Sequence, residues 1–304
     1  MKVKGYIFAA LAAAAYGTNP IFAKPLYAEG MNPDSVLLFR YLLALVLMGL
    51  IMLWSAYQKR KDGVKLSEVF HVGRHSLPQL ILMGLLMSAS SILLFMSYNY
   101  MPVGIASTLL FVYPIMVAVI MTLCFHEKMS WLVVACLALA SVGVAMLCKT
   151  NGATESLYDT SDFMTGFALV MASSLSYAIY LVGLNKTRIR TIASMPVTFY
   201  VLLFGLTIYL FRIACGVPLV LPHTLPMWLN CLGLGIFPTV ISLVFTSRAI
   251  QCIGSTQTAL FGAFEPVTAV ALGVVILGET ITLQEGIGMA LIFVAVSLVV
   301  KRRG

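Results

Sequence analysis

The sequence predicts an all-α integral membrane protein with ten transmembrane helices, built as two inverted five-helix repeats. Three observations predict this fold: a shortage of charged residues, ten long apolar runs and an internal repeat. The 304 residues are 61% hydrophobic and only 10% charged, whereas a soluble protein has roughly 25% charged residues. We therefore expect most of the exterior to face lipid.

Each apolar run has about the length that a helix needs to cross the hydrocarbon core, roughly 20 residues. Backbone groups in lipid must pair within the protein, so runs of this length are expected to be helical. A transmembrane β-barrel would instead show segments of roughly ten residues that alternate in polarity. The ten predicted helices are Gly5–Ala23, Val36–Trp54, Leu77–Tyr98, Gly104–Phe125, Trp131–Leu147, Phe163–Leu184, Pro196–Ile213, Trp228–Phe245, Thr256–Gly278 and Gly286–Val300.

The distribution of basic residues predicts the orientation. If both termini are cytoplasmic, all of the 19 Lys and Arg residues lie on the inner side except Lys24, Arg40, Lys149 and Arg212. Cytoplasmic loops carry such an excess of Lys and Arg. The net charge of +8 is thus explained by membrane topology, and we expect no nucleic-acid partner. The predicted location is the cytoplasmic membrane.

An internal repeat divides the chain into residues 1–150 and 151–304. Pro114 and Glu127 are separated by thirteen positions, and Pro266 and Glu279 repeat this separation. Because each half holds five helices, an odd number, the second half is expected to insert upside down relative to the first. Inverted repeats are typical of secondary transporters, whose solute site lies near the bilayer midplane between the halves.

Three sequence segments resemble the EamA-type transporters of the drug/metabolite transporter superfamily. They are Tyr-Gly-Thr-Asn-Pro-Ile-Phe-Ala-Lys at residues 16–24, Phe-Arg-Tyr-Leu-Leu-Ala at 39–44, and Phe-Glu-Pro-Val at 264–267 followed by Leu-Gly-Glu at 277–279. The first half departs from the family pattern at His126, which precedes Glu127 in place of glycine, and at Tyr113, where no acid precedes the proline. The resemblance implies transport of metabolites, a class that includes amino acids, nucleotide sugars and phosphorylated sugars.

Two charged residues within the apolar runs are candidates for function, because an ionisable group in the bilayer is costly unless it is paired or wet. Glu265 precedes Pro266, and a proline inside a helix frees a backbone carbonyl. We interpret Glu265 either as a solute-binding or proton-carrying carboxylate or as a structural partner of another group. Arg40 could capture a carboxylate or phosphate, or its long side chain could reach outward to anchor the helix or form an outer gate.

Hydroxyl and aromatic residues on several predicted helices indicate a polar central cavity. Singly, each is typical of helix packing in membranes; together they suit a small polar or zwitterionic solute. The candidate substrate-binding residues are Tyr16, Asn19, Arg40, Ser91, Tyr98, Tyr113, Tyr177, Tyr180, Ser242, Gln257 and Glu265. The fifth and tenth helices look peripheral, and their small residues favour close helix contact, with a homodimer as one alternative.

These features predict a secondary transporter that moves a small polar metabolite, an amino acid or a similar compound, across the membrane by alternating access, with export as one direction. The sequence contains no phosphate loop of the GxxxxGK[ST] type for ATP coupling. We expect no cofactor, no metal site and no catalytic residues. The alternatives are a passive channel or facilitator and a membrane-embedded lipid-modifying enzyme, although no reactive cluster for the latter is seen. The expected partners are a small-molecule solute and the lipid bilayer.

Overall fold

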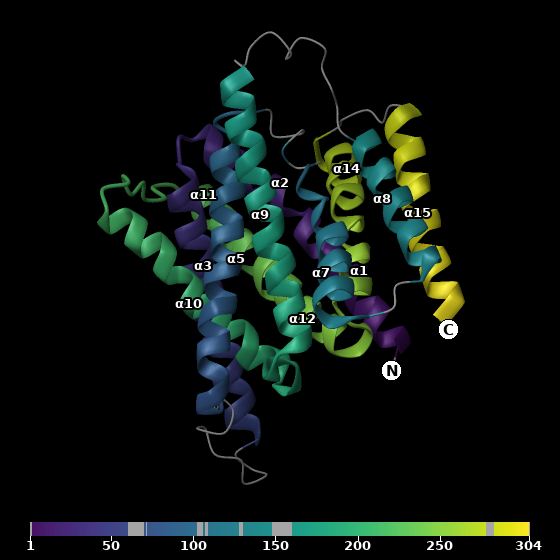
Figure 1. The fold of residues 1–304 in the computed structure, drawn as a ribbon. Helices are drawn as coiled ribbons and strands as arrows, with labels where there is room; N and C mark the ends of the chain where they lie inside the picture. Colours follow the sequence, from purple (N-terminus) through teal and green to yellow (C-terminus); the bar gives the residue numbers. More distant parts are fainter. Residues whose placement is uncertain are drawn as a thin grey trace.

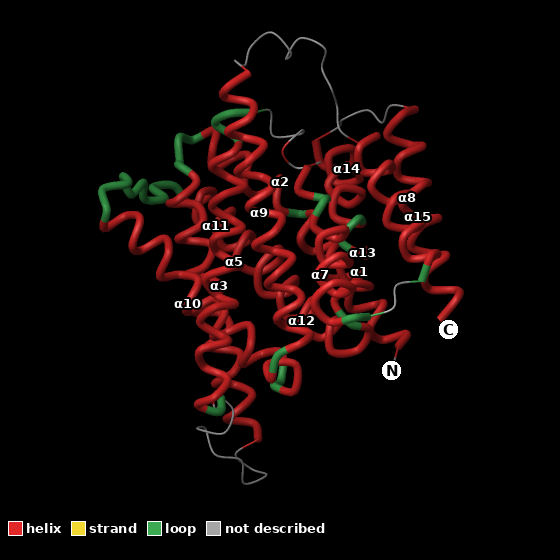
Figure 2. Tube along the Cα trace, viewed as in Figure 1, coloured by secondary structure: helices red, strands yellow, loops and turns green. Residues whose placement is uncertain are grey.

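The computed structural model describes residues 2–59, 70, 72–101, 106, 109–127, 130–147, 160–277 and 283–303. Throughout these residues the chain forms helices joined by loops, and no strand occurs in them (Figure 2). The predicted helical class is therefore confirmed. Glu279, Lys149 and His71 lie outside the described residues.

Seven helical segments of the described chain are long and apolar enough to cross a membrane, and three further apolar helices have 10–17 residues. The count of ten spans stays a prediction, since these three are short. In chain order the helices are α1 (Lys2–Gly17), α2 (Asn19–Ala28), α3 (Pro33–Lys59), η2 (Arg74–Ser76), α5 (Leu77–Ser97), α7 (Tyr113–Phe125), α8 (Trp131–Leu147), α9 (Thr160–Lys186), η3 (Arg188–Thr191), α10 (Ser194–Ala214), α11 (Leu225–Gly235), η4 (Ile236–Ile241), α12 (Ser242–Ile253), α13 (Ser255–Phe261), α14 (Phe264–Leu277) and α15 (Leu283–Arg303).

The first predicted helix is interrupted rather than continuous. It divides into α1 and α2 at Thr18, a correction to the predicted single segment Gly5–Ala23. Pro20 has no N–H to donate to the carbonyl four residues earlier, and its ring crowds that carbonyl. The Thr18 hydroxyl donates to Ala15 O at 2.7 Å, and the amide of Ile21 donates to Thr18 O at 3.1 Å. Local hydrogen bonds thus replace the missing helical one at the break.

The eighth predicted helix contains a π-helical turn, η4, between α11 and α12. Pro238 lies in this turn and cannot bond to the carbonyl of Leu234, four residues earlier. The Thr239 hydroxyl donates to Leu234 O instead, at 2.7 Å. Such π-bulges occur frequently at functional sites. The sequence predicted an ordinary helix at this position.

The helix contacts show how the two halves are related. By the internal repeat, α5 and α7 of the first half correspond to α12 and α14 of the second, and α1 corresponds to α9. The helices α5 and α7 pack on α9, whereas α12 and α14 pack on α1. The pairs α3–α10 and α8–α15 each join a helix to its own counterpart. In Figure 1, α1 starts at the end of the molecule where both termini lie, whereas α9 starts at the opposite end. This exchange of partners between oppositely directed helices is what a two-fold axis in the membrane plane produces.

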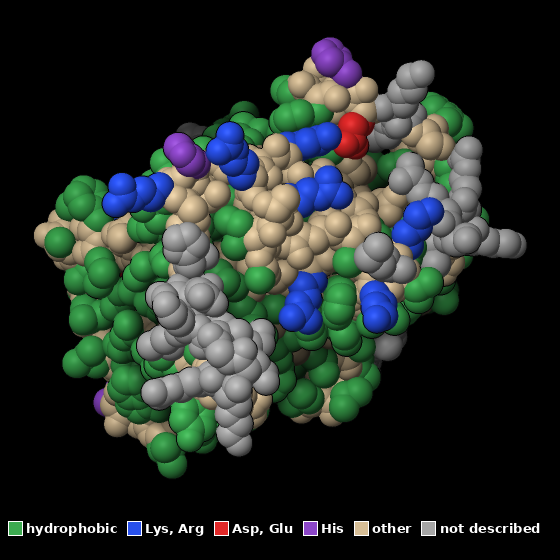
Figure 3. Space-filling view, turned by 90° about the horizontal axis from the view of Figure 1, so that it is seen from below, with side chains coloured by type: hydrophobic (Ala, Val, Ile, Leu, Met, Phe, Trp, Pro, Cys, Tyr) green, Lys and Arg blue, Asp and Glu red, His purple; other side chains and the backbone are tan. Residues whose placement is uncertain are grey.

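The surface has the character of a protein in lipid. Large apolar side chains on the spanning helices are exposed, for example Leu50, Trp54 and Val275. Lys and Arg side chains gather on the face that carries both termini, which Figure 3 shows from below. We call this the basic face. The charge distribution agrees with the predicted cytoplasmic position of the termini, which itself stays a prediction.

The two peripheral helices α8 and α15 pack on each other through glycine. A Cβ added to Gly143 would lie 2.7 Å from the Gly288 carbonyl oxygen and 2.8 Å from the Ile292 side chain. The small residues noted in the sequence therefore serve contact between the last helices of the two halves. Figure 1 shows this pair at one side of the bundle.

An ion pair joins α3 to α10 at the end opposite the basic face. Arg212 Nε donates to Asp34 Oδ1 at 2.5 Å and Nη2 donates to Oδ2 at 3.2 Å. We expect Asp34→Asn to lower the free energy of unfolding by about 1–2 kcal/mol, because charge-assisted hydrogen bonds to a buried carboxylate are lost while Arg212 stays partly solvated. Denaturant unfolding in mixed micelles measures this loss.

The matched control is the Glu127–Lys186 pair at the basic face, 2.7 Å apart with the Glu127 side chain 49% exposed. Glu127→Gln should change the free energy of unfolding by less than about 1 kcal/mol, as for other exposed pairs. Equal losses in the two variants would contradict the assignment of Asp34–Arg212 as the stabilising pair.

Candidate functional site

A small cavity lies between helices of both halves, and we call it the central cavity. Five of the predicted substrate-binding residues line it: Tyr16 from α1, Ser91 from α5, Tyr113 from α7, Tyr177 from α9 and Glu265 from α14. Its other lining residues are Met87, Ser90, Leu94 and Leu110. Its volume is about 20 Å³, room for a single water molecule at roughly 10–15 Å³ each. In this conformation the cavity is nearly closed.

The local backbone explains why Glu265 faces the cavity. Pro266 cannot donate to Gly262 O, and the amide of Glu265 donates to it at 2.8 Å instead, just before α14 proceeds. Gly17 of α1 packs closely on the start of α14. A Cβ added to Gly17 would lie 2.7 Å from the Thr268 Cβ and closer still to the Glu265 carbonyl oxygen. The close approach of α1 to α14 thus brings Tyr16 and Glu265 to one cavity.

Tyrosine rings form one wall of the central cavity. Tyr113 meets Tyr177 edge to face at a centroid distance of 4.8 Å, and Tyr177 stacks on Tyr180 at 5.9 Å. Tyr180 is buried behind Tyr177 and does not line the cavity. Such aromatic contacts hold their hydroxyls in fixed positions.

Arg40 is buried against the central cavity rather than reaching outward as an anchor. Its Nε donates to Thr239 Oγ1 at 2.6 Å and its Nη2 donates to Pro238 O at 3.1 Å. Its guanidinium carbon lies 5.5 Å from the centre of the Tyr16 ring. Arg40 is 1% exposed, so its side chain does not extend to the protein surface as the anchoring interpretation expects, while its role in a gate or in solute binding stays a prediction.

The remaining predicted residues lie elsewhere. Asn19 starts α2 beyond the break, where its Oδ1 is buried without a hydrogen-bond partner. Tyr98 packs edge to face on Phe95, and Ser242 is buried where η4 meets α12. Gln257 accepts a hydrogen bond from Tyr6 at 3.1 Å and lines a different pocket. The sequence placed these four residues in the central cavity, and the structure corrects this, because they do not line it.

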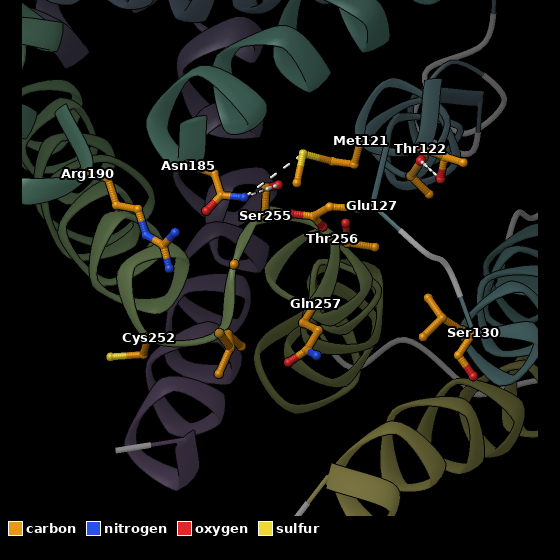
Figure 4. A pocket seen from close by; sticks show the side chains of 14 residues that line it. Met121, Thr122, Glu127, Ser130, Asn185, Arg190, Cys252, Ser255, Thr256 and Gln257 are labelled. Atoms are coloured by element: carbon orange, nitrogen blue, oxygen red, sulfur yellow. Dashed lines mark hydrogen bonds between the residues drawn. The ribbon is translucent and has the colours of Figure 1, made fainter. Parts of the chain in front are cut away.

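That second pocket is larger and lies toward the basic face; we call it the inner vestibule. Its volume is about 290 Å³, and the exposed residues Glu127 and Arg190 form part of its lining. Figure 4 shows Asn185 of α9 pointing toward Met121 of α7 and Ser255 of α13, so helices of both halves meet there. Asn185 Nδ2 donates to Ser255 Oγ at 3.2 Å, while its Oδ1 is buried without a partner. The vestibule is large enough for an amino-acid-sized solute.

Ring and hydrogen-bond contacts on α13 involve residues that line each of the two spaces, Gln257 in the vestibule and Tyr113 in the central cavity. Tyr6 stacks on Phe261 at a centroid distance of 5.5 Å and donates to Gln257. The Tyr113 hydroxyl donates to Ala259 O at 3.4 Å. These contacts join α1 and α7 to α13.

Apolar contacts and hydrogen bonds join α2 and α3 to the chain around α11 at the end opposite the basic face. Leu26, Val36, Met227 and Leu234 belong to one buried apolar cluster between α2, α3 and α11. Above it, Asn32 Nδ2 donates to Pro218 O at 2.6 Å, and the amide of Val220 donates to Ser35 Oγ at 2.9 Å. These contacts lie on α2, α3, the α10–α11 loop and α11, whereas the inner vestibule lies toward the basic face.

Several lining residues were missed by sequence reasoning. Asn185 lies at the end of a long apolar run, and Ser255 follows Gly254, whose φ of 83° ends α12. The Gly254-Ser255 step could have been recognised as a helix boundary. Within the described residues, no group of three His, Cys, Asp or Glu could hold a metal ion.

The sequence model of the EamA-like transporter family matches this chain twice, over residues 3–148 and 164–301. The chain belongs to the EamA-like transporter family. Among curated relatives, it is 29% identical to an uncharacterized transporter of Synechocystis sp. over 71% of this chain and 64% of that protein. It is 24% identical to one of Clostridium kluyveri and 26% identical to one of Bacillus subtilis, over 96% of this chain and 91% of each relative.

A solved structure has a similar fold. A crystal structure titled only as that of a protein superimposes with a TM-score of 0.80 at 16% identity, covering 98% of this chain and 97% of the other. This likeness concerns the fold alone. With the family match and the apolar helices, this EamA chain is a multi-pass membrane protein of a transporter family.

The orientation of this EamA protein can be tested with two of its cysteines. Cys215 is exposed at the end of α10 away from the basic face, whereas Cys252 lines the inner vestibule. In single-cysteine variants of intact cells, we expect a membrane-impermeant maleimide to label Cys215 at least about tenfold faster than Cys252, since the bilayer excludes a charged reagent. Permeabilised cells are the control, in which both cysteines should react. Labelling of Cys252 alone in intact cells would reverse the predicted topology.

Proposed function

We propose that this protein is a secondary transporter that moves a small polar metabolite, an amino acid or a similar compound, across the cytoplasmic membrane by alternating access. The observation that carries the proposal is a small central cavity shared by helices of both halves, together with the larger inner vestibule toward the basic face. The cavity holds Glu265 between helices of the two halves, which is where transporters of inverted repeats bind solute.

The two ends of the solute path differ in the way that alternating access requires. At the end opposite the basic face, an apolar cluster joins α2, α3 and α11, and hydrogen bonds join the α2–α3 turn to the α10–α11 loop, which supports closure there. The inner end has the 290 Å³ vestibule. A conformation open toward one side is half of a transport cycle, and the related halves supply a route to the mirror conformation.

A passive channel is the alternative to be separated by experiment. A channel needs a continuous wet path, whereas the central cavity has room for about one water molecule. The tyrosine and phenylalanine contacts between cavity and vestibule fit a gate that opens with solute. Carrier kinetics therefore decide between the two mechanisms.

The test begins with the purified full-length protein and a panel of amino acids, sugars, nucleosides, sugar phosphates and polyamines. A compound that binds only the folded state raises the apparent melting temperature. A labelled stabiliser is then offered to proteoliposomes preloaded with the same unlabelled compound. We expect a transient overshoot of label inside, which only a carrier produces. Uptake without overshoot would replace the carrier by a channel, and no flux of any stabiliser would overturn the transport proposal.

A further inference from the structure

The Arg40 guanidinium carries a charge that no described residue neutralises. It is 1% exposed, and both of its hydrogen-bond acceptors, Thr239 Oγ1 and Pro238 O, are neutral. Its third nitrogen, Nη1, is buried without any partner. The ion pairs found among the described residues join Lys186 to Glu127 and Arg212 to Asp34. A buried charge in this state is costly, so an anion is expected to reach it at some stage.

The surroundings of Arg40 offer further hydrogen-bond donors. The hydroxyls of Tyr27 and Tyr41 are also buried without partners. Tyr27 lies on α2, and Tyr41 follows Arg40 on α3, where its ring packs edge to face on Tyr209. Unpartnered phenol donors therefore lie on α3 itself and on the adjacent α2, and an anion at Nη1 would make charge-assisted hydrogen bonds with the guanidinium.

Arg40 is also close to the central cavity, although it does not line it in this conformation. Tyr16 lines the cavity together with Glu265, and its ring lies beneath the Arg40 guanidinium. Tyr16 therefore contacts both the Arg40 guanidinium and the space beside Glu265. The cation–π contact with Tyr16 offsets part of the missing counterion while the cavity is empty.

The charges therefore suit a solute that carries one charge of each sign. We propose that the solute is a zwitterion with a fixed orientation, its carboxylate bound by Arg40 and its ammonium group by Glu265. This inference rests on the proposed transport function and assigns its solute class. A single carboxylate neutralises Arg40, whereas a phosphate dianion would bring a second negative charge close to Glu265. A zwitterion leaves no uncompensated charge in the membrane interior.

The first experiment uses matched compounds with the purified wild-type protein. The probes are the sets alanine, ethylamine and propionate; leucine, isoamylamine and 4-methylvalerate; and phenylalanine, phenethylamine and 3-phenylpropionate, together with inorganic phosphate. Thermal stabilisation is measured against concentration. We expect at least one amino acid to bind at least tenfold more tightly than both of its single-charge analogues and than phosphate.

The second experiment assigns each end of the solute to a residue. In Glu265→Gln the amino acid and its desamino acid should bind equally, because the ammonium has lost its partner. In Arg40→Lys, which keeps a charge but loses the planar fork, the amino acid should bind at least tenfold more weakly. Arg248→Lys is the matched control, because Arg248 also lies over an aromatic ring, Phe8, at 5.7 Å. That variant should bind like the wild type.

Each contrary result overturns the inference. The inference is overturned if a desamino acid, an amine or phosphate binds the wild-type protein as tightly as the amino acid does. It is also overturned if no amino acid among the probes stabilises the protein. Unchanged preference in Glu265→Gln would remove its assigned role. If Arg40→Lys does not fold, the wild-type comparison alone decides. Counterflow of an uncharged sugar would keep the transport function and overturn only the zwitterion.

Discussion

Flux of the transported solute through Glu265→Gln is expected to fall at least about tenfold, with normal abundance of the protein in the membrane. Among the described residues that line the central cavity, Glu265 is the only acidic one. Glutamine keeps the size and the hydrogen-bonding oxygen but removes the negative charge and the titratable proton. A loss of flux would therefore report on charge rather than on packing. The measurement is counterflow in proteoliposomes, repeated over a range of pH.

The control for this result is Glu127→Gln, which removes a half-exposed carboxylate at the rim of the inner vestibule. Its flux should stay within about a factor of two or three of the wild type, because an exposed charge pair contributes little. If Glu265 also carries protons, the pH dependence of wild-type flux should disappear in Glu265→Gln. Wild-type flux of Glu265→Gln at every pH would show that the carboxylate is dispensable.

Replacing Gly84 with alanine is expected to lower the free energy of unfolding by about 1–3 kcal/mol. Gly84 lies where α5 crosses α10, and an added Cβ would be 2.8 Å from both Phe204 Cβ and the Val201 carbonyl oxygen. A backbone atom cannot move aside as a side-chain end does, so the two helices would have to separate. Small residues allow such close helix contacts in membranes.

The comparison variant is Gly286→Ala, since a Cβ at Gly286 in α15 meets no atom within 4 Å. Alanine favours helix over glycine by up to about 1 kcal/mol, so this variant should be as stable as the wild type or more so. Denaturant unfolding of both variants in mixed micelles separates the two effects. Equal stability of Gly84→Ala and Gly286→Ala would show that the α5–α10 contact tolerates extra volume.

The fold could be predicted from the sequence because hydropathy and charge act over whole helices. The order of the helices and the relation between the halves are predicted from apolar runs of about 20 residues. An error of a few positions in the ends of a run does not change that prediction. Interruptions within a run are local, and hydropathy averages over them. Pro20, Pro238 and Pro266 were visible in the sequence, yet only Pro266 was interpreted as a break in a helix.

The candidate site was predicted only in part, since the rotation of each helix about its axis is set by its neighbours. Tyr177 and Tyr180 are three residues apart on α9, and only Tyr177 reaches the central cavity. Ser242 follows the π-helical η4, whose wider turn rotates α12 relative to α11, an effect that periodicity alone cannot show. Arg40 was recognised as a charged residue in a helix, but its neutral partners Thr239 and Pro238 depend on contact between the two halves.

The three prolines also determine how the bundle deforms. Pro20, Pro238 and Pro266 each lack the N–H donor for one main-chain hydrogen bond. The helix pairs α1–α2, α11–α12 and α13–α14 are therefore expected to bend more easily at these prolines than elsewhere. The 10-residue α2 is roughly 15 Å long, so a bend of about 10° at its joint displaces its far end by about 3 Å. A small rotation near the central cavity is thus amplified, by leverage, into a displacement at the membrane surface comparable to the diameter of a water molecule.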